Sequence, residues 1–456
     1  MSAPPVIGPG VTVHSARSPG ATAHSAISPV AQPSEPALKV AVVAEFYPRR
    51  GDPVLGVWAH RQALAAQAAG AEVHVLVLHR LVPPRAALAN GRTGVGGGAR
   101  ALGGLLRDWG GGVLDRGRDG LPVTYVPYVS PPRWRSYHAW GAWAAPALTL
   151  ALRRLHHRVG IDVIHAHNAV PAGDAVRRVG LRAPLVVSVH GGDVLYTAHR
   201  SAAGRAAVAR GLGAARLVLA NSRGIAELAR EHGAREVRVV HLGTDLPAAG
   251  TRDPGRQLPV EPLTAGRRVG GGDHGAPSLV TVGHLVARKR HADVVRALAV
   301  LTPRHPTLRY VIVGDGPERV AIEGLAVRLG VRDRVHLCGQ LEHAGALARA
   351  RRCTIFAMPS TEEAFGVAYI EAMAGGLPAI GCRGEPGPEE IAAAGDGFVL
   401  VPPGDIERLT QRIDELLSDP ARLREAGRRA RATVAAHFTW ERCGEQTVAA
   451  YEQALR

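Results

Sequence analysis

One stretch, from residue 353 to residue 382, constrains the fold of this chain more than any other. It begins with an apolar, β-favouring run at 353–358, which Pro359 ends. A polar loop follows, and apolar residues then recur at helical spacing over 367–374 until two glycines stop the helix. A second apolar run, 379–382, comes straight after. This order predicts an α/β unit in which the loop after the first strand borders a ligand crevice.

Two glutamates in this stretch carry its chemistry. We predict Glu363 in the loop, facing the crevice, and Glu371 one to two turns inside the helix. Between them, the backbone N–H groups near Phe365 and Gly366 open the helix, where unpaired donors and the macrodipole favour an anion. An anion flanked by carboxylates suggests a ligand with phosphates and hydroxyls, such as a nucleotide sugar. The alternative is a surface loop whose acids merely favour a helix start.

Length and charge bound the class of protein. The 456 residues suggest two or three domains with ample chain for their cores. The net charge of +16 favours anionic partners in general. Arginine is scattered without a run of five or six basic residues, so we expect solvated helix faces first and attraction to an acidic membrane surface second. We expect no nucleic-acid partner.

Cysteine usage and hydropathy indicate the compartment. Cys338, Cys353, Cys382 and Cys443 lie far apart without zinc spacing, which favours buried thiols in a reducing compartment. No window approaches the run of about 18 apolar residues that a spanning helix needs. The N-terminus lacks the charged start and apolar core of a signal peptide. We therefore expect a cytoplasmic protein, with peripheral contact to the inner face of the membrane as a further possibility.

The first half of the chain reads as βαβ units. A buried strand from Lys39 precedes a loop that contains Gly56, a helix and a second strand, but the loop does not spell G-x-G-x-x-G. Residues 82–120 show no clear period and read as a long loop. The aromatic residues that follow, Trp134, Tyr137, Trp140 and Trp143, form either core packing or a surface for an acceptor or a membrane.

A histidine motif follows one strand of this half. The strand 185–189 ends in His190, two glycines and Asp193. A histidine at a strand's carboxyl end, with glycines that let a backbone approach and an acid nearby, suits proton handling or the orientation of a sugar hydroxyl. The alternative is a structural hydrogen-bonding role.

A lysine motif opens the second half. The strand 279–282 is followed by Gly283 and His284, and Lys289 then precedes a helix. A cation beside the free N–H groups of a helix start would neutralise a diphosphate. Gly316 lies in a tight turn after a further strand.

The stretch around Glu363, Phe365, Gly366 and Glu371 resembles the E-x7-E signature of retaining glycosyltransferases of family 4. The resemblance implies an α/β fold of the GT-B type: two facing Rossmann-like domains, a deep interdomain cleft and a C-terminal helix that crosses back onto the first domain. It also implies that Glu371 holds the ribose of the nucleotide and that Glu363 approaches the donor sugar.

The resemblance assigns roles to the other motifs. It implies that His190 and Asp193 orient hydroxyl groups of the acceptor or donor, and that Lys289 with His284 stabilises the leaving diphosphate. Donor contacts at the glycine positions (Gly56, Gly283, Gly316, Gly366) follow in the same way. Two positions depart from the family pattern, because Leu55 replaces one of two paired glycines and His284 replaces an arginine.

The predicted organisation follows from these motifs. We expect a disordered tail at 1–37, an acceptor domain at 38–247, a linker at 248–277, a donor domain at 278–437, and a closing helix at 438–456.

The predicted function is the transfer of a sugar, with retention, from a UDP- or GDP-type nucleotide sugar. The expected acceptor is a glycan, a lipid-linked sugar or a small molecule of the kind used in bacterial polysaccharide or glycolipid biosynthesis. No Asp-x-Asp motif stands at a strand end, so we expect neither a metal nor another cofactor. The alternatives are a sugar-nucleotide 2-epimerase on the same fold and a non-catalytic protein that binds nucleotide sugars.

Overall fold

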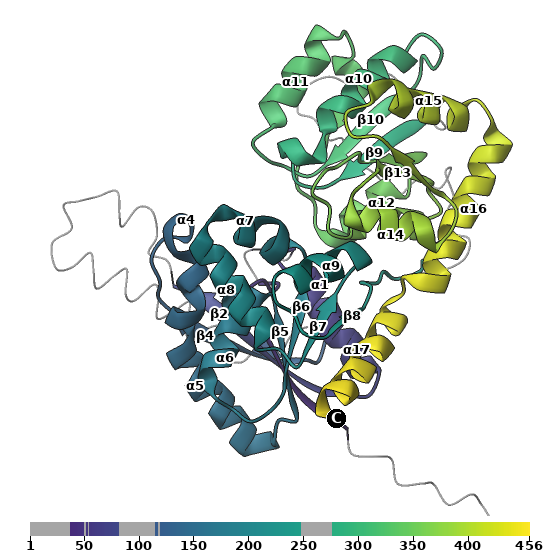
Figure 1. The fold of residues 1–456 in the computed structure, drawn as a ribbon. Helices are drawn as coiled ribbons and strands as arrows, with labels where there is room; N and C mark the ends of the chain where they lie inside the picture. Colours follow the sequence, from purple (N-terminus) through teal and green to yellow (C-terminus); the bar gives the residue numbers. More distant parts are fainter. Residues whose placement is uncertain (1–36, 50–51, 53, 82–114, 117–118, 248–275) are drawn as a thin grey trace, which may run out of the picture. The chain divides into compact units, whose positions relative to one another are not determined.

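The computed structural model describes residues 37–49, 52, 54–81, 115–116, 119–247 and 276–456, which form two α/β sheets with their helices (Figure 1). The irregular segment predicted after residue 82, the tail and the linker lie largely or wholly outside the described residues.

The first sheet runs in the order β3-β4-β2-β1-β5-β6-β7-β8. Its strands are parallel except β3, which pairs antiparallel with β4. The bounds are β1 Lys39–Ala44, β2 Glu72–Arg80, β3 Asp115–Arg116, β4 Pro122–Tyr128, β5 Val163–His167, β6 Leu185–Val189, β7 Leu217–Ala220 and β8 Val237–Val239. The order reverses direction between β1 and β5, and ligands of doubly wound folds bind at such a switch point.

The second sheet runs in the order β11-β10-β9-β12-β13-β14, the doubly wound Rossmann order. All of its printed pairings are parallel. The bounds are β9 Ser278–Val282, β10 Arg309–Val313, β11 Val335–Leu337, β12 Ile355–Ala357, β13 Ala379–Cys382 and β14 Phe398–Val401. Its switch point lies between β9 and β12.

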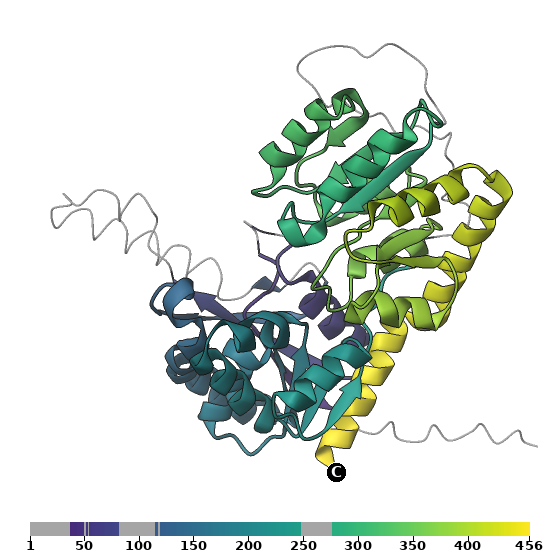
Figure 2. The same ribbon diagram turned by 45° about the horizontal axis from the view of Figure 1, so that its top comes forward.

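Helices cover both sheets (Figure 2). Those of the first half are α1 Val57–Ala68, α4 Arg133–Ser136, α5 Trp140–Val159, α6 Asp174–Val179, α7 Ala198–Arg200, α8 Ala202–Gly213 and α9 Arg223–Glu231. Those of the second half are α10 His291–Leu301, α11 Arg319–Arg328, α12 His343–Ala350, α13 Val367–Ala374, α14 Pro386–Ala394, α15 Ile406–Leu417, α16 Pro420–His437 and α17 Trp440–Leu455. Each described helix is too short or too polar to cross a membrane.

Local chemistry explains several of these boundaries. Ser222 caps α9 and Asp405 caps α15, because each side chain accepts a hydrogen bond from a backbone N–H group of the first turn. Thr439 caps α17 in the same way. The central strands of the sheets, such as β1, β5, β6 and β7, are rich in apolar residues and are buried on both faces, as parallel strands between two helical layers must be.

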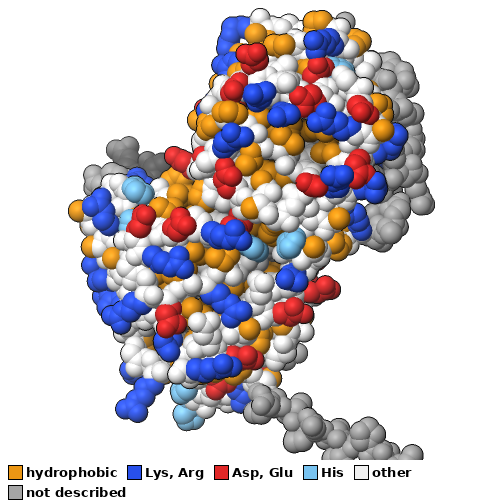
Figure 3. Space-filling model, turned by 45° about the vertical axis from the view of Figure 1, so that its right-hand side comes forward, with side chains coloured by type: hydrophobic (Ala, Val, Ile, Leu, Met, Phe, Trp, Pro, Cys, Tyr) orange, Lys and Arg blue, Asp and Glu red, His pale blue; other side chains and the backbone are white. Residues whose placement is uncertain are grey.

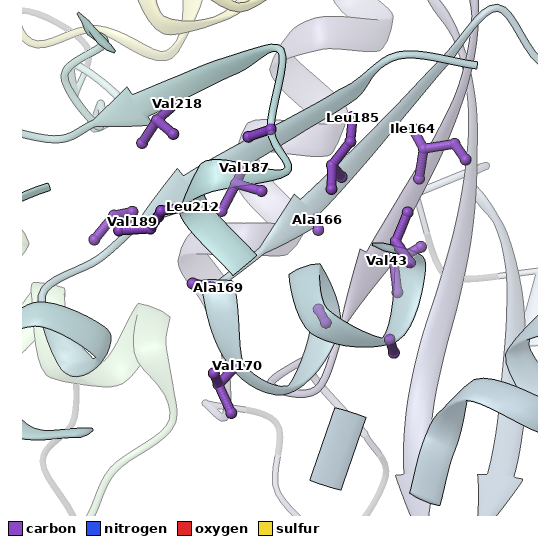
Figure 4. Packing of buried hydrophobic residues seen from close by; sticks show 14 of the residues in the cluster. Val43, Ile164, Ala166, Ala169, Val170, Leu185, Val187, Val189, Leu212 and Val218 are labelled. Atoms are coloured by element: carbon purple, nitrogen blue, oxygen red, sulfur yellow. The ribbon is translucent and has the colours of Figure 1, made fainter. Parts of the chain in front are cut away.

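One apolar cluster of the first sheet lies on the face that α5, α6 and α8 cover. Figure 4 shows its side chains from adjacent strands, including Val43, Ile164, Val187 and Val218, which meet Ala169, Val170 and Leu212. The opposite face carries a second cluster, to which α1 and α17 contribute.

The C-terminal helix joins the core of the first sheet. Cys443, Ala450 and Tyr451 of α17 are buried in the cluster that also holds the strands β1 and β2. Gly444 lets the helix approach closely, since a Cβ there would lie 2.2 Å from the carbonyl oxygen of Ala65 in α1. The expectation that the closing helix packs back on the first domain is thus confirmed.

Two elements were not predicted from the sequence. The strand β4 contains Pro122 and Pro127, which argue against a strand, yet it pairs in parallel with β2. The helix α16 is rich in arginine and alanine and shows little apolar period, although Ala430 and Val434 reach the core of the second sheet. Cys353, Cys382 and Cys443 are buried free thiols, as expected.

Candidate active site

Two charged side chains meet at the switch point of the second sheet. Lys289 follows β9 by way of a short 3-10 turn, and Glu363 follows β12. The ammonium nitrogen of Lys289 lies 2.5 Å from Oε2 of Glu363. Arg288 contributes a second cation at 3.8 Å from the same oxygen. The structure therefore brings together two residues that the sequence placed on separate loops.

Glu363 is a buried, ionised carboxylate. Burial acts to raise its pKa, but the charge and hydrogen bond of Lys289, with Arg288 and the hydroxyl of Ser360, outweigh burial and lower the pKa below its usual range. Ser360 donates to Oε2 of Glu363 at 2.9 Å. The backbone N–H of Glu363 donates to Glu385 at 2.9 Å, which fixes the loop. This site can hold a negative charge beside two cations.

Gly366 opens the helix that follows. Its φ of 90° favours glycine, and a Cβ there would lie 2.3 Å from a ring carbon of Tyr369. Tyr369 is itself fixed by a hydrogen bond between its hydroxyl and Ser360 at 3.0 Å. The close packing keeps the first N–H groups of α13 next to Glu363, where a ligand oxygen could reach them.

Glu371 lies inside α13 and pairs with a residue of another helix. His343, the first residue of α12, donates from Nε2 to Oε1 of Glu371 at 2.7 Å. This hydrogen bond raises the pKa of His343, although burial opposes the shift. The sequence did not indicate this partner, because residue 343 carries no motif.

The other predicted donor-site residues occupy loops at the carboxyl edges of the sheets. His284 is exposed after β9, and Gly283 lies within ordinary contact distance of Lys289, 3.7 Å from its Cε. A Cβ at Gly316 would lie 2.5 Å from the carbonyl oxygen of Leu285. Gly56 caps α1 with a φ of 65°.

Phe365 is a core residue by its side chain. It is 2% exposed and packs in the apolar cluster of the second sheet, with its ring 5.9 Å from that of His241 and 5.7 Å from that of Phe438. This placement leaves the backbone of residue 365 for a ligand rather than its ring.

His190 belongs to a row of three histidines. A hydrogen bond of 2.9 Å joins Nδ1 of His167 to Nε2 of His190, and the two ring planes differ by 3°. The ring of His165 lies 4.5 Å from that of His167, and His165 Nδ1 is 2.8 Å from the hydroxyl of Tyr451 in α17. Sequence reasoning treated His190 alone. The alternation His165, Ala166, His167 in a strand was the available signal, because it puts both histidines on one face.

Burial keeps this row neutral. It lowers the pKa of His190 to about 3 and that of His165 to about 3, and lowers the pKa of His167 well below its usual range. Nδ1 of His190 and Nε2 of His167 are buried without a hydrogen-bond partner among the described residues. A buried polar atom without a partner destabilises the folded protein, and a ligand that hydrogen-bonds to it removes this cost.

Asp193 acts on the protein backbone. Its carboxylate accepts hydrogen bonds from the backbone N–H groups of Ala169 at 2.9 Å and Val170 at 3.3 Å. The side chain is 2% exposed, and burial raises its pKa to about 7. Through these contacts Asp193 holds the loop after β5, and its orientation of substrate hydroxyls stays a prediction.

The loop of Glu363 reaches the loops of the first sheet. A Cβ at Gly191 would lie 2.4 Å from the Cβ of Ala364, so glycine is needed for this approach. The hydroxyl of Ser222 donates to the carbonyl oxygen of Ala364 at 2.9 Å. Glu390 accepts from the backbone of Arg223 at 3.0 Å and from His241 at 2.8 Å. These contacts lie after β6, β7 and β8.

Lysine usage gives a signal that the motifs did not. The chain has 55 lysines and arginines, and the lysines are Lys39 and Lys289 alone. A sequence that uses arginine almost everywhere but keeps lysine beside Glu363 indicates a site that needs a compact ammonium group rather than a planar guanidinium.

Comparisons with known proteins agree with this geometry. A family model described as "Glycosyltransferase Family 4" matches residues 55–247, and one described as "Glycosyl transferases group 1" matches residues 266–433. The chain belongs to glycosyltransferase family 4. The two models together account for most of the chain, including Lys289, Glu363, Glu371 and His190.

Similar curated proteins are transferases. This family member is 29% identical over 331 residues to 2-deoxystreptamine glucosyltransferase of Streptomyces kanamyceticus, covering 69% of this chain and 83% of that protein. It is 31% identical over 177 residues to a GDP-mannose-dependent phosphatidylinositol monomannoside mannosyltransferase of Corynebacterium glutamicum, covering 37% and 45%. A match of 36% identity to an exopolysaccharide phosphotransferase of Streptomyces coelicolor covers 34% of this chain but only 16% of that protein's length.

Solved structures share the fold. Sucrose-phosphate synthase of Thermosynechococcus elongatus superposes with a TM-score of 0.67 at 22% identity, covering 91% of this chain and 98% of that one. HepE of Anabaena, in complex with UDP and glucose, superposes with a TM-score of 0.63 at 18% identity, covering 91% and 100%. The expectation of two Rossmann-like domains of the GT-B type is confirmed.

Proposed function

We propose that this glycosyltransferase moves a sugar, with retention, from a UDP- or GDP-type nucleotide sugar to a hydroxyl of an acceptor. The observation that carries the proposal is the contact of 2.5 Å between Lys289 and Glu363 at the switch point of the second sheet. The relatives support the donor class, since one is GDP-mannose-dependent and a protein of the same fold holds UDP and glucose.

Lys289 and Glu363 have distinct roles in this proposal. As the bond between the sugar's anomeric carbon and the diphosphate breaks, negative charge grows on the leaving oxygen, and the ammonium of Lys289 with Arg288 stabilises it. Glu363 holds Lys289 in place before the donor binds and then faces the transferred sugar. The acceptor oxygen bonds to the anomeric carbon, and its proton passes to the leaving diphosphate.

The nucleotide side of the donor is assigned to Glu371. One of its oxygens is held by His343, and the other, which no described side chain contacts by a hydrogen bond, can accept hydrogen bonds from the ribose hydroxyls. The N–H groups that begin α13 at Gly366 supply donors for a phosphate oxygen, and Gly316 and Gly283 allow close backbone approach nearby.

His190 is assigned to a sugar oxygen. Its Nδ1 is buried and unpaired among the described residues, and its low pKa keeps the ring neutral, so it can exchange one hydrogen bond with a hydroxyl group. Positive side chains and helix N–H groups take the part that a metal has in other transferases. We therefore propose no metal and no other cofactor.

A membrane-facing surface accompanies this proposal. On the outer side of α5, Trp143 and Leu150 are 51% and 53% exposed, and Arg154 lies on the same side of the helix. An exposed tryptophan with neighbouring arginines suits the interface of an acidic membrane. On the face drawn in Figure 3, by contrast, basic side chains are scattered among acidic ones. We propose that a lipid-linked acceptor is approached from α5, on the inner face of the membrane.

A screen of nucleotide sugars tests the proposed function. UDP-, GDP- and ADP-sugars are added to the full chain, and the melting temperature is measured with each. A donor at about 100 times its dissociation constant stabilises the folded state by about 2.7 kcal/mol. Product from the stabilising donor is then examined for retained configuration and for free epimerised sugar nucleotide. Epimerised product would support the epimerase, and binding without turnover would support a binding protein.

A further inference from the structure

Glu45 lies at the switch point of the first sheet, where no role has been assigned to it. It follows β1 directly, and β1 pairs with β5 in a register that sets Ala44 beside His167. Glu45 is thus next to the loop that begins with Asn168, whose φ of 75° is unusual for a residue other than glycine. Strained backbone of this kind gathers at functional sites.

Within the described part of the chain, Glu45 is held by a hydrogen bond to one of its two carboxylate oxygens. The hydroxyl of Tyr137 donates to Oε2 of Glu45 at 2.9 Å and contacts the carbonyl oxygen of Val170 at 3.2 Å. The other carboxylate oxygen, Oε1, has no hydrogen-bond partner within the described part of the chain. Burial raises the pKa of Glu45, although Arg133, Tyr137 and Arg80 oppose the shift. Glu45 is half-buried, and Oε1 is not among the buried unpaired atoms of the described residues, so this oxygen is open to solvent and to a ligand.

The guanidinium of Arg133 lies over two aromatic rings next to Glu45, those of Tyr137 and Phe46. Its guanidinium carbon lies 4.2 Å from the ring centre of Tyr137 and 5.1 Å from that of Phe46. Trp58 extends this aromatic surface, with its ring 6.4 Å from Phe46 and 6.0 Å from His190. Aromatic rings, an arginine and the histidine assigned to a sugar oxygen therefore lie around the loop that follows β1.

We propose that Glu45, held by Tyr137 and close to the charge of Arg133, forms the subsite for a neutral, hydroxyl-bearing acceptor ring. This inference rests on the proposed function. The free carboxylate oxygen accepts a hydrogen bond from a ring hydroxyl, and Arg133 donates to a neighbouring oxygen. Rings of this kind also pack their apolar faces on aromatic side chains such as Trp58.

The charges around the subsite favour a neutral ligand. An ammonium group would meet Arg133 and Arg80, whose charges act on Glu45. A phosphate or carboxylate would meet Glu45 itself and the nearby Asp193, whose pKa the charge of Glu45 raises. A neutral hydroxyl group is repelled by neither charge. It can donate a hydrogen bond to Glu45 while it accepts one from Arg133.

The position suits the acceptor rather than the donor. The loop of Glu363 contacts the first sheet at Gly191 and Ser222, after β6 and β7. In the strand order, β1 lies two strands from β6, which is about 10 Å at the usual strand spacing. Glu45 therefore lies on the far side of His190 from the donor loop, where the ring that receives the sugar would extend.

The test compares Glu45→Gln with a matched control on the same sheet, Glu72→Gln. Glu72 is the first residue of β2, whereas Glu45 follows the last residue of β1, so the two lie at opposite edges of the sheet, and Glu72 pairs with His74. Tyr137→Phe is a second variant, which keeps Glu45 but removes the hydroxyl group that donates a hydrogen bond to it. Saturation-transfer NMR measures binding of two neutral probes, methyl α-D-glucopyranoside and myo-inositol, and of two charged ones, glucosamine and glucose 6-phosphate. Melting temperatures with the stabilising nucleotide sugar report donor binding.

We expect wild type and Glu72→Gln to bind the neutral probes more tightly than the charged ones. Glu45→Gln should weaken neutral-probe binding about 10- to 100-fold, as expected for the loss of a hydrogen bond to a charged group, and Tyr137→Phe should weaken it less. Donor binding should be unchanged in all three variants. Three outcomes would overturn the proposed subsite. Glu45→Gln could bind the neutral probes as tightly as wild type does, wild type could prefer a charged probe, or wild type could bind neither neutral probe. Failure of every nucleotide sugar to stabilise wild type would instead count against the proposed function.

Discussion

The ammonium of Lys289 and the carboxylate of Glu363 lie 2.5 Å apart although 74 residues separate them in the chain. Both are largely buried, so the pair is screened little by solvent, and removing one partner leaves the other charge uncompensated. The pair therefore fixes both side chains at the switch point of the second sheet, where the proposed reaction uses the cation.

Lys289→Ala should lower turnover about 10²- to 10³-fold, because one electrostatic donor to the leaving diphosphate is lost. Lys289→Arg should also be impaired, since a guanidinium does not fit the contact of an ammonium. The same changes at Lys39, the other lysine of the chain, are the control and should leave turnover unchanged. Steady-state kinetics measure both. Turnover of Lys289→Ala within a few-fold of wild type would remove Lys289 from the leaving-group site.

Glu371→Gln should mainly raise the donor KM, whereas Glu363→Gln should mainly lower kcat. Ribose hydroxyls change little during the reaction, so a contact with them binds ground state and transition state alike. The transferred sugar changes its charge as its bond breaks, so a contact with it acts on the transition state. Kinetics with varied donor decide between the two, with circular dichroism as the check on folding. The reverse pattern would mean that the two roles are exchanged.

Activity should persist in a chelator. The proposed charge stabilisation comes from Lys289, Arg288 and the N–H groups at the start of α13, and none of these depends on a divalent ion. Turnover is measured with EDTA and again after magnesium or manganese is added. An absolute requirement for either ion would refute this account of the leaving group.

Acid should destabilise the protein through its buried histidines. His165 and His190 have a pKa of about 3 when folded, against about 6.5 when unfolded, so the unfolded state binds more protons between these values. The contribution of each histidine to stability should be constant above about pH 6.5 and fall below it, by up to about 1.4 kcal/mol per pH unit, while Asp193, whose folded pKa is raised, offsets part of this loss.

Urea unfolding at pH 7.5 and pH 5.5 measures this loss. His165→Gln removes one titrating group and should flatten the dependence on pH even if it lowers stability overall. His157→Gln, on the exposed side of α5, is the control and should leave the slope unchanged. An unchanged slope in His165→Gln would contradict the assignment of a neutral buried ring.

Replacing Trp143 and Leu150 together with serine should weaken binding to vesicles that contain acidic lipids. A matched control is the pair Val320 and Val327, which has the same spacing on α11 and is 79% and 61% exposed. Sedimentation with vesicles measures binding, and added salt should lower it because arginine attraction is screened. Equal losses in both double variants would remove α5 as the membrane-facing surface.

The sequence by itself determined the local elements and the residues at their ends. Apolar runs, glycines and prolines mark strand and helix boundaries over a few residues. Glu363, Lys289 and His190 could therefore be placed on crevice loops, and Glu371 inside a helix, without a structure. Where local signals conflict with tertiary packing, the reading failed, as for β4 with its two prolines.

Only the tertiary structure decided which of these residues meet. The strand orders bring β9 beside β12 and β1 beside β5, and with them Lys289 to Glu363. The contact of Tyr137 with Glu45 spans 92 residues, and that of Tyr451 with His165 spans 286. Such contacts depend on how whole elements pack and not on nearby sequence. The contacts within the histidine row, the hydrogen bond from His343 to Glu371 and the Glu45 oxygen without a partner among the described residues therefore became visible only in the folded chain.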